Sequence, residues 1–268
     1  MKRLSLFRFA PFVLLFSVCF SACSSSNDDY DNGGDNGFPT KSGKLLSKWS
    51  ANLSDGQWYV LSFKYDSLYR VSKINFSFSV GSQYNYTESF TYTDTLIYYT
   101  YIMDNDTIQP HRSYKLALLN DLIIWKNDTN IDSYSYDQNG YIKLKSHYGT
   151  YKQNHHIWSE GNLTKIENDN KSEITNFEYT DIAWPKNFIF NPNGDHMWGP
   201  LSPLGYWGKT PKNLPKRQIL MKRKSGELVV AEDTKYEYTI IDGHPVRFVA
   251  TTYTPEDTTT SNVILEWY

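Results

Sequence analysis

A carboxylate, an imidazole and an indole fall close together in the C-terminal half of the chain. They belong to Asp195, His196 and Trp198, and the amide of Asn193 lies just ahead of them. Aromatic faces stack on sugar rings, and the polar groups can hydrogen-bond to sugar hydroxyls. This grouping predicts a ligand cleft for a glycan, with Trp207 as a second aromatic contact.

The same stretch also has a structural interpretation. It lies within residues 184–215, which hold six of the chain's 11 prolines. Proline removes a donor from a sheet ladder, so this range predicts a long structured loop. In this interpretation the loop is a plug over one end of a sheet, with Trp198 and Trp207 buried and Asp195 capping a turn.

The sequence gives little support for a catalytic site or a metal site. His155 and His156 are adjacent, and adjacent residues of a strand point to opposite faces, so they cannot chelate one ion. There is no Gly-x-Ser-x-Gly, no His-Glu-x-x-His and no phosphate-binding glycine loop. Glycoside hydrolysis needs two opposed carboxylates, and the spacing selects no pair. We therefore expect no catalytic residue, no metal and no cofactor.

The elements around this loop have the pattern of strands. Apolar residues at Ile74, Phe76 and Phe78 alternate with polar ones, which is typical of antiparallel strands with one wet face. Aromatic pairs recur just before turn sequences such as 137–140 and 242–243. We expect an all-β fold in which antiparallel hairpins form a meander, either a large sheet or a half-barrel. The pattern leaves open whether the sheet closes.

The composition excludes two classes of protein. The formal net charge is −2 and aromatic residues make up 16% of the chain. An aromatic-rich chain of this size can bury a core, which excludes an intrinsically disordered protein. A near-neutral chain lacks the basic surface of a nucleic-acid binder, which excludes that class as well.

The N-terminus reads as an export signal. Basic residues precede an apolar run that is too short to span a bilayer. Residues 1–22 therefore predict a signal peptide. Ser21-Ala22-Cys23 resembles the lipobox of bacterial lipoproteins, which implies a lipid on Cys23 and a membrane anchor. Residues 23–43 are rich in Ser, Asn, Asp and Gly and predict a flexible tether. The remaining residues, 44–268, are expected to form one β domain.

A wider resemblance rests on three features. Residues 136–142 and 161–166 look like tyrosine-aspartate hairpin repeats, and residues 205–215 carry a Gly-Tyr-Trp-Gly motif. With the lipobox, these features resemble a Bacteroidetes lipoprotein family of unknown function described as having a porin-like fold. The resemblance implies a fold and no activity. A membrane-spanning barrel is disfavoured, because Asn262, Ile264 and Glu266 make a poor lipid-facing register.

Two further predictions concern the protein's location and its surface. Acidic residues after the anchor resemble the export signal of Bacteroidetes surface lipoproteins, which implies the cell surface, with the periplasmic face of the outer membrane as the alternative. Four Asp-Ser or Asp-Thr pairs resemble acceptors of Bacteroidetes O-glycosylation, although both pairs are also good turn formers. The acceptors would be Ser67, Thr95, Thr107 and Thr258.

Together these observations favour a lipid-anchored outer-membrane or cell-surface protein whose β domain is a non-catalytic binding module for a glycan. The first alternative is a structural or adhesion module that binds another protein through its sheet. A glycan-active enzyme is the third hypothesis. The sequence predicts no oligomeric state.

Overall fold

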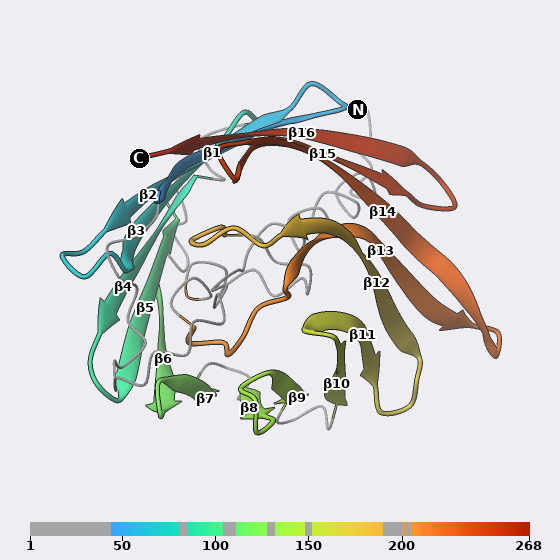
Figure 1. The fold of residues 1–268 in the computed structure, drawn as a ribbon, viewed down its shortest axis with the longest axis horizontal. Helices are drawn as coiled ribbons and strands as arrows, with labels where there is room; N and C mark the ends of the chain where they lie inside the picture. Colours follow the sequence, from blue (N-terminus) through green and yellow to red (C-terminus); the bar gives the residue numbers. More distant parts are fainter. Residues whose placement is uncertain are drawn as a thin grey trace, which may run out of the picture.

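The structure is a computed structural model that describes residues 44–80, 85–103, 111–127, 132–147, 152–189, 201 and 205–268. These residues form 16 strands in one closed antiparallel barrel, in which each strand pairs with its neighbours in sequence and β1 pairs with β16 (Figure 1). The predicted all-β antiparallel meander is confirmed. The sheet is a closed barrel and not a half-barrel, because its first and last strands pair with each other.

The strands have the following bounds: β1 Leu46–Leu53, β2 Trp58–Tyr65, β3 Val71–Phe78, β4 Tyr86–Tyr92, β5 Leu96–Met103, β6 His111–Leu119, β7 Leu122–Asn127, β8 Asp132–Tyr136, β9 Ile142–His147, β10 Lys152–Ser159, β11 Asn162–Asn168, β12 Glu173–Ala183, β13 Asn213–Lys224, β14 Glu227–Ile241, β15 His244–Tyr253 and β16 Thr258–Trp267.

Alternation along each strand decides which side chains enter the barrel. Trp49 of β1 pairs with Leu61 of β2, and both are fully buried. Their neighbours Lys48 and Ser62 pair on the opposite, outward face. Because paired residues share a face, the register carries this assignment around the barrel. The inner face is largely apolar and aromatic, and the outer face is largely polar.

Four hairpins turn in two residues. In each, both turn residues have positive φ, as type I′ turns require. They are Asn120-Asp121, Glu160-Gly161, Ser225-Gly226 and Asp242-Gly243. The turn predicted at 242–243 is confirmed.

The two ends of the barrel differ. We call the end with the start of β1, the end of β16 and the turns 66–70, 137–141 and 242–243 the terminal end. The opposite end, with turns 54–57, 169–172 and 254–257, is the far end. At the terminal end the backbone NH of Tyr268 donates to the carbonyl of Leu45, which ties the two ends of the described chain together.

Aromatic side chains lock the terminal end. Six even-numbered strands carry a Tyr hydroxyl or Trp indole NH that donates to a backbone carbonyl of the preceding strand, at 2.6–2.8 Å. The pairs are Tyr65 to Leu46, Tyr92 to Val71, Tyr136 to Ile123, Trp158 to Ile142, Tyr179 to Leu163 and Trp267 to Pro245. This explains why aromatic residues recur just before turns.

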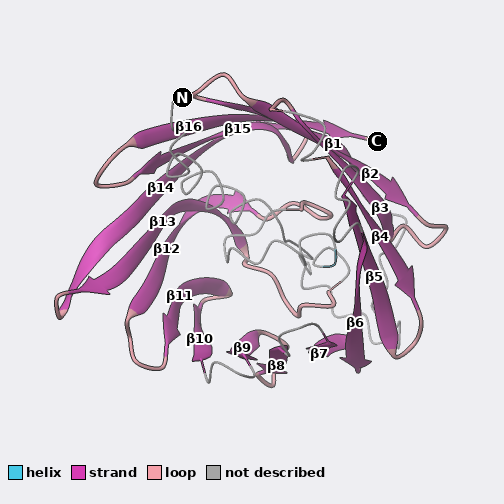
Figure 2. Ribbon diagram, turned by 180° about the vertical axis from the view of Figure 1, so that it is seen from behind, coloured by secondary structure: helices cyan, strands magenta, loops and turns pink. Residues whose placement is uncertain are grey.

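A long segment interrupts the meander between β12 and β13, although these strands still pair. We call residues 184–212 the crossing segment, of which 184–189, 201 and 205–212 are described. Its backbone bonds follow the terminal end: the Tyr206 carbonyl accepts from Ile123, and the NH of Lys209 donates to the Gly140 carbonyl. Figures 1 and 2 show its described part inside the ring of strands. The interruption ends at Lys212 and not at 215, because Pro215 lies in β13.

Candidate functional site

The predicted ligand residues lie on the crossing segment. Asn193, Asp195, His196 and Trp198 fall outside the described residues. Trp207 is described and is half-buried. Its ring meets the ring of Tyr134 on β8 edge to face, with centroids 4.7 Å apart. Trp207 therefore sits against the inner wall of the barrel.

Tyr134 leads to a polar cluster that the sequence did not reveal. Its hydroxyl donates to Asp132 Oδ2 at 3.3 Å. His147 Nδ1 lies 2.6 Å from Asp132 Oδ1, and Lys145 Nζ lies 3.8 Å from Oδ2. Lys126 pairs with Asp132 across β7 and β8. We call Lys126, Asp132, Lys145 and His147 the inner-wall cluster.

The cluster keeps its carboxylate charged. Burial by itself raises the pKa of Asp132, but the hydrogen bond with His147 and the positive charges of Lys145 and Lys126 lower that pKa overall. Asp132, Lys126 and Lys145 are all buried in the described structure. The Lys126 ammonium also lies 5.2 Å from the ring centroid of Tyr114, within cation–π range. Buried charges persist only when they are paired in this way.

Strand register places the cluster on the inner face. Buried Leu116 of β6 starts a row of cross-strand partners that share its face: Lys126, Asp132, His147 and Lys152. Lys152, the first residue of β10, is exposed at the far end. The row therefore runs from the buried core to water.

A second row brings another ionisable group inward. Buried Ile74 of β3 pairs with Glu88, Glu88 with Tyr101, and Tyr101 with Arg112 at the far end of β6. Arg112 is exposed, whereas Glu88 is buried and accepts a hydrogen bond from the Tyr99 hydroxyl at 3.1 Å. Burial raises the pKa of Glu88 to about 8.

Sequence reasoning missed Glu88, although a signal was present. Glu88 falls between Tyr86 and Phe90, at the alternate positions that point inward. A carboxyl group in an otherwise aromatic series marks an inward polar residue. The inner-wall cluster has no comparable signal, because β7, β8 and β9 are short and mix charged with apolar residues.

The histidine pair behaves as expected. His155 faces outward and lies 2.7 Å from Asp169, while His156 is buried and faces inward. Within the described residues, no group of three His, Cys, Asp or Glu side chains could hold a metal ion. Likewise, no helix in the described part of the chain is long and apolar enough to cross a membrane.

The described modification sites lie at turns or directly beside them. Ser67, Thr95 and Thr258 are exposed, while Thr107 and Cys23 lie outside the described residues. The Asp preceding Ser67 orders its turn, because Asp66 Oδ1 accepts from the backbone NH groups of Leu68 and Arg70. Both a turn-forming role and access for a transferase are compatible with these positions.

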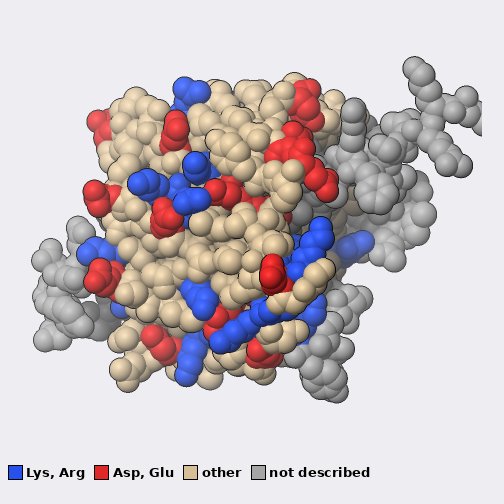
Figure 3. Space-filling model, turned by 90° about the vertical axis from the view of Figure 1, so that its right-hand side faces the viewer, with Lys and Arg blue, Asp and Glu red and all other residues tan. Residues whose placement is uncertain are grey.

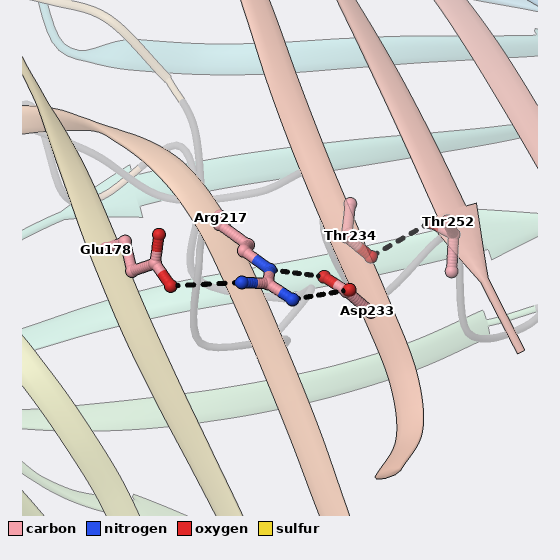
Figure 4. A network of polar contacts seen from close by, with 5 residues as sticks. All are labelled: Glu178, Arg217, Asp233, Thr234 and Thr252. Atoms are coloured by element: carbon pink, nitrogen blue, oxygen red, sulfur yellow. Dashed lines mark hydrogen bonds and ion pairs between the residues drawn. The ribbon is translucent and has the colours of Figure 1, made fainter.

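The outer face carries charge where a lipid-facing barrel would be apolar. Arg217 of β13 makes two hydrogen bonds to Asp233 of β14, at 2.7 and 2.8 Å, and one to Glu178 of β12 at 3.2 Å (Figure 4). Behind this network, on the inner face, Thr234 and Thr252 share a buried hydrogen bond. Charged side chains of both signs spread over this side of the barrel (Figure 3).

Comparison with known proteins gives a fold and no activity. No model of a known protein family matches the chain, and no curated protein does. The chain is similar to the crystal structure of a porin-like protein from Bacteroides uniformis ATCC 8492, with a TM-score of 0.58 and 17% identity over 83% of this chain and 96% of that one. It is also similar to a porin-like protein from Bacteroides vulgatus ATCC 8482, with a TM-score of 0.54 and 12% identity over 84% and 99% of the two chains. At these identities the similarity shows the fold alone.

Proposed function

We propose that this chain is a lipid-anchored outer-membrane protein whose barrel stands in water and acts as a non-catalytic binding module for a glycan. The observation that carries the first part is the polarity of the barrel. Its inner face is largely apolar and aromatic, and its outer face holds Arg217, Asp233 and Glu178. A membrane-spanning barrel has the reverse pattern, and each Arg or Lys facing lipid near the midplane costs roughly 2–4 kcal/mol.

A water-exposed barrel needs a separate attachment to the membrane. A lipid on Cys23 and the tether of residues 23–43 would supply it, and β1 begins directly after the tether. About twenty flexible residues span roughly 25 Å on average. The terminal end would then lie nearest the membrane and the far end would point away. We place the protein on the cell surface, with the periplasmic face as the alternative.

The glycan part of the proposal rests on Trp207 and its neighbours. A half-buried indole lies beside Tyr134, whose hydroxyl connects to Asp132 of the inner-wall cluster. Aromatic rings next to charged hydrogen-bonding groups are the combination that recognises sugars. The crossing segment also carries Asn193, Asp195, His196 and Trp198, which we propose as further ligand contacts.

Titration calorimetry of the purified chain against a panel of host and dietary polysaccharides tests the glycan proposal. We expect binding that Trp207→Ala weakens about tenfold, because the loss of a stacked aromatic ring costs roughly 1.4 kcal/mol. Trp58→Ala is the matched control, since Trp58 is exposed on the outward face. A flat titration across the panel contradicts the proposal. A stoichiometric protein partner without glycan binding would favour an adhesion module instead.

Cell fractionation tests the anchor. Cys23→Ser should move the protein from the membrane fraction to the soluble fraction and abolish labelling with a fatty acid analogue. A protein that stays in the membrane after this change would contradict a water-exposed barrel.

Intact mass of the native protein tests the O-glycosylation proposal at Ser67, Thr95, Thr107 and Thr258. The proposal fails if no hexose-sized additions are found.

A further inference from the structure

We infer that the ligand is an anionic glycan, with its acidic groups held by cations on the inner face of β6–β10 and its sugar rings on aromatic side chains beside them. This inference rests on the proposed glycan binding and specifies its chemical class.

The inner face of these strands has an unequal charge. Among its described inward-facing residues, register assigns four cations and one anion. The cations are Arg112, Lys126, Lys145 and Lys152, and the anion is Asp132. A wall with an excess of one charge attracts the opposite charge, and partial exclusion of water strengthens the attraction.

The two cations at the far end are the accessible ones. Arg112 and Lys152 are both exposed, and each faces inward by its pairing with Tyr101 and His147, respectively. Neither side chain has a hydrogen bond or an ion pair with another residue in the described part of the chain. Asp132, in contrast, already contacts His147 and Lys145. A guanidinium and an ammonium in this state suit carboxylate or sulfate groups.

An aromatic surface adjoins Arg112. Its cross-strand partner Tyr101 packs on Tyr86 at 4.8 Å between ring centroids, and Tyr86 stacks on Phe76 at 4.5 Å. Tyr86 and Tyr101 are both half-exposed. The apolar face of a sugar ring could rest on these rings while its acidic substituent reaches Arg112.

The carboxyl group in the same row does not neutralise this site. Glu88 lies two strands from Arg112, roughly 10 Å across the sheet. It is buried against Tyr99, and burial raises its pKa to about 8, so it is mostly uncharged at pH 7. The positive charge at the far end therefore stays available for a ligand.

Calorimetry of the full-length chain with three hexasaccharides tests the inference: a neutral galactan, an oligogalacturonate that carries only carboxylates and a sulfated galactan that carries only sulfates. We expect at least one acidic probe to bind ten times more tightly than the neutral one. That affinity should fall as salt rises from about 50 to 500 mM, because salt screens the attraction. Preference for the carboxylate or the sulfate probe identifies the acidic group.

Variants locate the site. Arg112→Gln and Lys152→Gln should each weaken acidic binding about tenfold and leave neutral binding unchanged. Lys115→Gln is the matched control, because Lys115 lies on the same strand but faces outward. Thermal unfolding checks that every variant is folded. Equal binding of neutral and acidic probes, unchanged by Arg112→Gln, overturns the inference and leaves glycan binding intact. Absence of binding by any probe overturns both.

Discussion

At the scale of single residues, the inner face is defined by the few polar groups that its aromatic lining tolerates. Glu88 is the clearest case, because it is buried with a hydrogen bond from Tyr99 and packed near Phe90. A carboxyl group in this position is favoured in its neutral form. Its cost to the fold therefore depends on pH.

The pH dependence of stability follows from the sign of this shift. The pKa of Glu88 rises from 4.5 to about 8 in the fold, so the folded chain binds more protons than the unfolded chain between these values. The free energy of unfolding should fall as pH rises through this window and level off above pH 8. Glu88→Gln should remove this decline and stabilise the protein at pH 9 by on the order of 1–3 kcal/mol.

Urea unfolding at pH 5, 7 and 9 measures this effect. Glu237→Gln is the control, because Glu237 is exposed and faces outward on β14. Parallel pH profiles for the wild type and Glu88→Gln would show that Glu88 is not a buried acid.

At the scale of elements, the turns and strands can be predicted from local sequence, whereas the path of the crossing segment cannot. Asp242-Gly243 needs positive φ at both residues, and Asp and Gly are residue types that tolerate it. The proline pattern likewise predicted an interruption after β12. Its path could not be predicted, because it depends on contacts with Ile123 and Gly140, which come from distant hairpins. For the same reason Trp207 was identified as a site residue while its partner Tyr134 was not.

The docking of the crossing segment depends on Gly208, and Gly205 offers a comparison because its backbone conformation is similar. Gly208 has φ +78° and Gly205 has φ +72°. A Cβ on Gly208 would collide with the Gly140 carbonyl oxygen and lie 3.0 Å from the Tyr136 ring, whereas one on Gly205 meets no atom within 4 Å. We expect Gly205→Ala to cost about 1–2 kcal/mol through backbone strain alone, and Gly208→Ala to cost roughly 1–3 kcal/mol more.

Chemical unfolding of the two variants isolates the close approach, because strain is common to both. The excess cost of Gly208→Ala should appear together with weaker glycan binding, since Trp207 precedes this glycine. Equal costs for the two variants would mean that the crossing segment does not pack against the 137–141 turn as described.

At the scale of the whole molecule, closure is what the sequence left undecided. Alternation and turn sequences are the same in an open sheet and in a barrel, since both place one face inward. What differs is the pairing of β1 with β16, whose residues are more than 200 positions apart. No local pattern encodes such a contact, and closure also removes the two exposed edges that an open sheet would present.

A designed disulfide tests closure directly. Ser50 and Ile264 are direct partners on the outward face of β1 and β16. Direct partners in antiparallel sheets have Cα atoms about 4.5–5.5 Å apart, within the range that a disulfide spans. With Cys19 and Cys23 both replaced by Ser, the pair Ser50→Cys and Ile264→Cys should oxidise readily and stabilise the protein by roughly 3–5 kcal/mol, because the bond closes a very long loop. The pair Asn52→Cys and Ile264→Cys is offset by two residues and should stay reduced, since its Cα atoms would lie roughly 8 Å apart. Thiol titration and the urea midpoint distinguish the pairs, and a sheet whose edges never meet would leave both reduced.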